Sequence, residues 1–166
     1  MSLRDVSLAS RRRWHTIAFS LVAFWIVAGV GITVANIWGA PVVWWDLIHP
    51  FTLGALTTAI LVFSTHFTEA LTRTPAVGFR GVGARVGLVQ MGLVLLLVDR
   101  AGYDWGVLAD IGSALVIAAV AWHLWALWGK LRGSLSGSFA VTVPFYLAAA
   151  CFMICLLYTS DAADDS

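Results

Sequence analysis

Residues 14–38 contain no Lys, Arg, Asp or Glu, so this stretch can cross a membrane as a single helix. A bilayer core about 30 Å thick needs roughly 20 apolar residues in helical conformation. Over the whole chain, 60% of the residues are hydrophobic and 11% are charged, against about 45–50% and about 25% in soluble domains. This composition excludes a soluble globular enzyme. The net charge of +1 excludes the basic surface of a nucleic-acid-binding protein.

Five apolar stretches predict an all-α integral membrane protein, a bundle of about five transmembrane helices within residues 14–154. The predicted spans are 14–38, 50–71, 82–98, 105–128 and 139–157. Pro50 is expected in the first turn of the second span, where its missing N–H costs nothing. Gly83 and Gly87 form a small-xxx-small pair in the third span. Such a pair suits packing within the bundle or contact between two copies.

Charged residues divide between the two sides of this partition. Of the 10 Lys and Arg residues, Arg100 alone lies on the side that carries Asp46, Asp99, Asp104 and Asp110. Lys and Arg favour the cytoplasmic side of short loops. We therefore expect the basic segment 1–13 to lie in the cytoplasm and the chain to be a multi-pass protein of a bacterial plasma membrane.

Few ionisable residues fall inside the predicted spans, where they are costly and therefore informative, and the candidates among them are His66, Glu69 and His123. His66 and Glu69 are three residues apart on the second span and so share a helix face. His123 lies on the fourth span, and helix rise puts His66 and His123 at similar depths, roughly 8 and 10 Å from the same end. They could ligate haem iron or another metal, with Glu69 orienting one imidazole. Alternatively, these residues form hydrogen bonds between helices.

A second, weaker candidate lies at the opposite end of the second span. His49 precedes Pro50, and Asp46 is three residues earlier. An imidazole and a carboxylate at a membrane surface can bind a divalent metal or transfer protons. The alternative is a polar helix start with no ligand.

The second span also carries a family resemblance. The run HPFTLGALTTAILVFSTHFTEAL at 49–71 resembles the first His-containing helix in the membrane region of actinobacterial multicopper oxidases of the copper-containing nitrite reductase type. Residues 121–123 and the run SFAVTVPFYLAAA at 138–150 are similar to the same region. More distantly, the second span is similar to membrane subunits of the haem–copper oxidase superfamily.

This resemblance implies that the chain is a membrane-anchoring fragment of a copper oxidoreductase, and that His49, His66 and His123 are the polar positions of its bundle. A haem b or copper ion would allow it to transfer electrons. The catalytic chemistry would belong to cupredoxin domains downstream, so the fragment alone is not expected to be an enzyme. The alternatives are a non-redox membrane protein, such as a small transporter subunit, and a haem-b membrane subunit without a cupredoxin partner.

The last residues differ in character from the spans. The string CLLYTSDAADDS at 155–166 resembles a translated sequencing adapter that recurs at the ends of unrelated metagenomic reading frames. We therefore expect residues 155–166 to be non-native and the natural sequence to continue beyond Ile154. The alternative is a genuine acidic tail.

Overall fold

The computed structural model describes residues 8–72, 79–100, 106–133, 144–145, 148–149 and 151–152. The elements are the α-helices α1 (Leu8–Ile37), α2 (Trp44–His49), α3 (Thr57–Thr72), α4 (Arg80–Arg100) and α5 (Val107–Arg132), and the π-helical segment η1 (Pro50–Leu56). Within this part of the chain the secondary structure is entirely helical.

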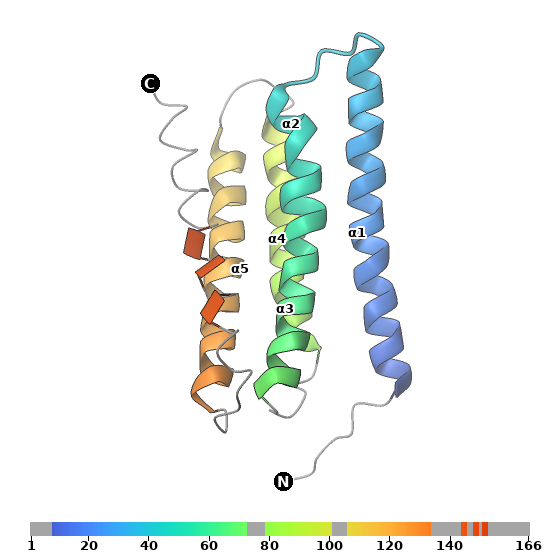
Figure 1. Cartoon of the computed structure of the whole chain (residues 1–166). Helices are drawn as coiled ribbons and strands as arrows, with labels where there is room; N and C mark the ends of the chain where they lie inside the picture. Colours follow the sequence, from blue (N-terminus) through green and yellow to red (C-terminus); the bar gives the residue numbers. More distant parts are fainter. Residues whose placement is uncertain are drawn as a thin grey trace.

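Four helical stretches are long and apolar enough to cross a membrane: Arg12–Ile37, Trp44–Thr72, Arg80–Asp99 and Val107–Arg132. They run antiparallel to their sequence neighbours, side by side in one bundle (Figure 1). The predicted all-helical class is confirmed for the described residues, and these four helices are consistent with the predicted multi-pass protein. The predicted fifth span, 139–157, lies largely outside the described residues, as does the whole of 155–166.

The bundle has two ends of different charge. The start of α1, the end of α3, the start of α4 and the end of α5 meet at one end (Figure 1). We call this the basic end. The Lys and Arg residues of these helix termini whose side chains the structure describes are Arg12, Arg13, Arg80, Lys130 and Arg132. Asp46, Asp99 and Asp110 lie at the opposite end, which we call the acidic end. The charge segregation expected from the sequence is therefore present in the fold.

The second span begins earlier than predicted. Its helix starts at Trp44 rather than at residue 50, because α2, η1 and α3 follow one another without a break. Inside an α-helix, proline clashes with the carbonyl four residues before it. Here the chain continues from Pro50 in the wider π-helical form, in which the Thr57 N–H bonds to the Thr52 carbonyl, five residues back. The Thr57 hydroxyl donates to the same oxygen at 2.9 Å.

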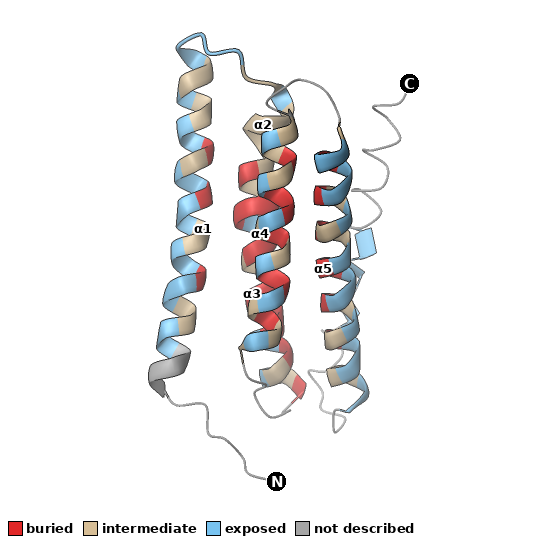
Figure 2. Cartoon of the chain, turned by 180° about the vertical axis from the view of Figure 1, so that it is seen from behind, coloured by how far each residue is buried: buried red, intermediate tan, exposed pale blue. Residues whose placement is uncertain are grey.

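Most of the buried residues lie where α3, α4 and α5 face one another, whereas α1 shows only a narrow buried stripe (Figure 2). In the most apolar window of the first span 17% of the residues are buried, against 50% in the second. A Cβ on Gly54 would lie 2.5 Å from the Trp25 ring, so the absence of a side chain at Gly54 allows the Trp25 indole of α1 to pack directly on η1. The Trp25 indole N–H donates to Gln90 of α4, whose amide donates to Thr58 of α3 at 2.7 Å.

The closest approach of two helix backbones joins α4 to α5. A Cβ added to Gly92 would lie 2.6 Å from the Gly112 carbonyl oxygen, and one added to Gly112 would lie 2.7 Å from the Gly92 oxygen. The pair singled out from the sequence behaves differently. A Cβ added to Gly83 would lie 3.4 Å from the Trp14 ring of α1, which is an ordinary contact, and one added to Gly87 would have nothing within 4 Å. Gly92 and Gly112 therefore set the spacing of α4 and α5.

At the acidic end a side chain of α4 caps α5. The Asp99 carboxylate accepts hydrogen bonds from the backbone N–H groups of Gly106 (2.7 Å) and Ala109 (2.8 Å). The first N–H groups of a helix have no partner within the helix and carry partial positive charge. A carboxylate from the neighbouring helix therefore ties the two helices together and satisfies both donors.

Replacing Asp99 with alanine removes both acceptors, so we expect the free energy of unfolding to fall by about 1–2 kcal/mol. Asp99→Asn keeps one amide oxygen and should lose roughly half as much. Unfolding in mixed micelles measures the stability, and amide hydrogen exchange at Gly106 reports the cap itself, because the Ala109 N–H also donates to the Gly106 carbonyl at 3.0 Å and keeps that bond in the variant. Unchanged exchange at Gly106 in the Asp99→Ala variant would show that the carboxylate does not cap α5.

Candidate functional site

A group of ionisable and hydroxyl side chains lies between α3, α4 and α5, in the half of the bundle nearer the basic end. We call it the polar cluster. Its members are Ser64, Glu69, Arg85, His123 and Lys130. His123 is 1% exposed and Arg85 is 5% exposed. His123 precedes Lys130 by seven residues, so it lies roughly 10 Å from Lys130 along the axis of α5. Burial of this kind requires hydrogen-bonding partners within the protein.

Both ring nitrogens of His123 are hydrogen-bonded. The Arg85 guanidinium lies 2.9 Å from Nδ1, and the Ser64 hydroxyl lies 2.8 Å from Nε2. Arginine can only donate, so Nδ1 accepts and the imidazole is the neutral tautomer with its proton on Nε2. That N–H donates to Ser64, whose hydroxyl donates to the Ile60 carbonyl. Arg85 also donates from Nε to the Gly81 carbonyl at 3.0 Å.

These bonds form a continuous chain that begins and ends on main-chain carbonyls of α4 and α3, with the imidazole of α5 in the middle. A carbonyl oxygen accepts hydrogen bonds and does not pass on a proton. The chain therefore acts as a clamp between three helices. The guanidinium also lies over the Trp122 ring, 6.0 Å from its centroid, which adds a weak cation–π attraction.

Glu69 supplies the negative charge of the polar cluster. Its carboxylate pairs with the Lys130 ammonium and so joins α3 to α5. The negative charge of Glu69 also attracts Arg85. One carboxylate thus acts on two cations that face the interior of the bundle.

His66 lies on a different face of α3 from the residues that contact His123. Ser64 and His66 are two residues apart, a rotation of roughly 200° around a helix. The His66 ring is exposed and faces His15 of α1 edge-on, with 5.7 Å between the ring centroids. The structure therefore does not bring His66 and His123 together around one ion or haem. Because Arg85 and Ser64 occupy both nitrogens of His123, these residues do not fit a shared cofactor.

The weaker candidate, His49 with Asp46, lies on α2 at the acidic end. His49 stacks on Trp45 with 3.6 Å between ring centroids, and its Nδ1 lies 2.7 Å from the Trp45 carbonyl, to which it must donate. In the described part of the chain, His, Cys, Asp and Glu side chains do not gather in groups of three or more suited to a metal.

Sequence reasoning missed Arg85 as a functional residue and counted it only among the basic residues on the side opposite Arg100. The signal was present, because position 85 falls inside the predicted span 82–98 and an arginine within a span is a candidate site by default. Ser64 was also missed, because a hydroxyl residue in a membrane helix is common and carries little information by itself.

Comparison of the chain with protein-family models, with curated proteins and with solved structures found no match. In the part of the chain that the structure describes, the fold and the polar cluster define an all-helical bundle with four helices long and apolar enough to cross a membrane and with hydrogen-bonded ionisable side chains between its helices.

Proposed function

We propose that the chain is the membrane-anchoring domain of an oxidoreductase of the multicopper oxidase or copper-containing nitrite reductase type, with its N-terminus in the cytoplasm of a bacterium. One observation supports anchoring above all others. Arg85 and His123, the two buried ionisable side chains among the described residues, are engaged in holding helices together. Buried polar groups that bond only to neighbouring helices serve to hold a bundle together, which is the role expected of an anchoring domain. The copper chemistry rests on the resemblance of the run at 49–71 and of the later segments.

The proposed orientation draws its support from the basic end. Its five described Lys and Arg residues, named above, lie at one end of the bundle, and the acidic residues Asp46, Asp99 and Asp110 lie at the other. Basic residues mark the cytoplasmic side of short loops. In this orientation the acidic end faces outward, which is where cupredoxin domains downstream would be exported.

Long-read sequencing of genomic DNA through the codon of Ile154 tests this proposal. We expect further coding sequence with additional spans, followed by cupredoxin segments that carry the His, Cys and Met ligands of copper. A genuine stop codon after Ser166 would contradict the copper oxidoreductase proposal.

A second candidate is a non-redox membrane protein whose histidines serve packing, and the two hydrogen bonds of His123 favour it. The optical spectrum of the purified protein bears on this choice. If haem transfers electrons, the purified protein should show a Soret band. His66→Ala or His123→Ala should then remove that band while the protein remains folded. Absence of a Soret band, with loss of stability alone in His123→Ala, would support packing and end the proposal of haem-mediated electron transfer.

A further inference from the structure

The histidines of the described chain fall into two groups. His123 and His49 use ring nitrogens in hydrogen bonds to the protein. His15 and His66 differ, because among the described residues neither imidazole makes a hydrogen bond or ion pair. They come from α1 and α3, and their rings face each other at 5.7 Å between centroids and 87° between planes. Two imidazoles in edge-to-face contact, whose nitrogens bond to no described residue, are a candidate ligand pair.

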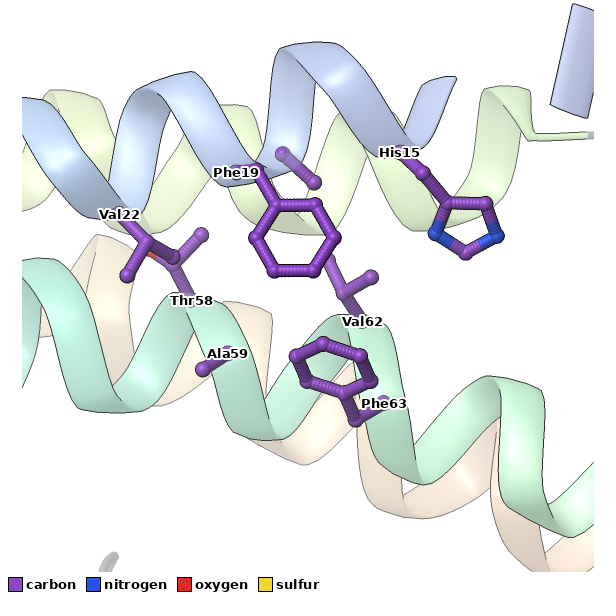
Figure 3. A pocket seen from close by; sticks show the side chains of 8 residues that line it. His15, Phe19, Val22, Thr58, Ala59, Val62 and Phe63 are labelled. Carbon is purple, nitrogen blue, oxygen red and sulfur yellow. The ribbon is translucent and has the colours of Figure 1, made fainter. Parts of the chain in front are cut away.

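The surroundings of this pair form a pocket at the basic end of the groove between α1 and α3. Its lining comprises Trp14, His15, Val62, Thr65, His66, Glu69, Phe79 and Val82. Toward the middle of the bundle the groove becomes apolar, and Figure 3 shows His15 at one end of this part, beyond the rings of Phe19 and Phe63. Trp14 stacks on Phe79 with 5.5 Å between ring centroids. Aromatic walls limit water on one side of the imidazoles.

The separation of the two rings is compatible with a metal ion between them. Bonds of about 2 Å from each nitrogen to a metal place the centres of two ligating imidazoles roughly 6 Å apart when the rings lie on opposite sides of the ion. The observed 5.7 Å is close to that spacing. Imidazole suits zinc, copper, iron and nickel, and Cu²⁺ is bound most tightly among the divalent ions.

We infer that His15 and His66 form a binding site for a first-row transition metal, with Cu²⁺ preferred among divalent ions, that bridges α1 to α3. The remaining coordination positions are open to the groove, for water or an exogenous ligand. Glu69 lines the same pocket and supplies negative charge near the ion while paired with Lys130. This inference stands apart from the proposed function, because it uses neither the copper-domain resemblance nor His123.

The test uses the full chain without a polyhistidine tag, purified in detergent, stripped of metal and titrated with Cu²⁺ and separately with Zn²⁺. We expect one Cu²⁺ per chain, with nitrogen hyperfine structure from two imidazoles in the electron paramagnetic resonance spectrum. His15→Ala and His66→Ala should each weaken binding by roughly tenfold or more, since each removes one of the two ligands. His66→Cys should retain a site with a changed spectrum, because thiolate also ligates copper.

Two matched controls keep the test specific. His49→Ala leaves the pair intact and should bind Cu²⁺ as the parent does. Glu69→Gln should keep both nitrogen couplings. Equal weakening by His49→Ala, or binding that survives the His15→Ala, His66→Ala double substitution in a folded chain, would overturn the inference.

Discussion

Replacing Gly92 with valine is expected to lower the free energy of unfolding by about 3 kcal/mol, at the upper end of the usual cost of overpacking. The cost is high because the atom that a Cβ meets, at 2.6 Å, is the Gly112 backbone carbonyl oxygen, not a flexible side chain. The helices must move apart. Chemical unfolding in mixed micelles measures the loss, and a fluorophore pair on α4 and α5 reports the separation.

Gly87→Val is the matched control on the same helix, because nothing lies within 4 Å of a Cβ at that position. Its stability should stay within about 0.5 kcal/mol of the parent. The same variant examines the sequence prediction for Gly83 and Gly87. If it weakens self-association of the chain while the monomer stays stable, contact between two copies explains that pair. Equal destabilisation by the two valine substitutions would contradict the packing described for α4 and α5.

The second large effect is expected at the centre of the polar cluster. Replacing His123 with leucine leaves the buried Arg85 guanidinium without its imidazole acceptor. Hydrogen bonds to charged groups contribute about 1.5–3 kcal/mol, so we expect His123→Leu to lower the free energy of unfolding by about 2–3 kcal/mol. His66→Leu in metal-free protein is the control and should cost less than about 0.5 kcal/mol.

A double-mutant cycle separates the interaction from the loss of each side chain. With Arg85→Met alone, Nδ1 of His123 loses its donor. In the double variant both partners are apolar, and replacing a buried polar pair by packed apolar groups is often close to neutral. The loss of unfolding free energy in the double variant should therefore be smaller, by at least about 1 kcal/mol, than the sum of the losses in the two single variants. If the two single losses simply add in the double variant, the 2.9 Å hydrogen bond between Arg85 and His123 does not contribute to stability.

The helical membrane class could be predicted from the sequence because the uncharged apolar stretches leave few alternatives. The segregation of charge between the two ends could also be predicted, because residues such as Arg80 and Lys130 lie at the borders of these apolar stretches. The start of the second span was placed six residues too late, at Pro50 instead of Trp44. Proline normally marks a helix start, and nothing local in the sequence shows that the chain continues through a π-helical turn.

The candidate site was less accessible to sequence reasoning. The similar depths of His66 and His123 follow from helix rise, which explains why they were paired. Depth alone does not fix the face of a helix against which a neighbour packs. Ser64 faces α5 and His66 faces α1, so the partners of both histidines depend on the packing of three helices. The choice between a ligand pair and a hydrogen-bonded clamp therefore needed the fold.

The central claim is that His123 is a neutral imidazole clamped between Arg85 and Ser64. Nitrogen-15 NMR of histidine-labelled protein at neutral pH tests it most directly. We expect one imidazole signal set with Nε2 protonated and Nδ1 unprotonated, shifted by hydrogen bonding, absent in His123→Leu and altered in Arg85→Met. A His123 ring protonated on both nitrogens, or one that exchanges rapidly between tautomers, would contradict the clamp and return the residue to the set of candidate ligands.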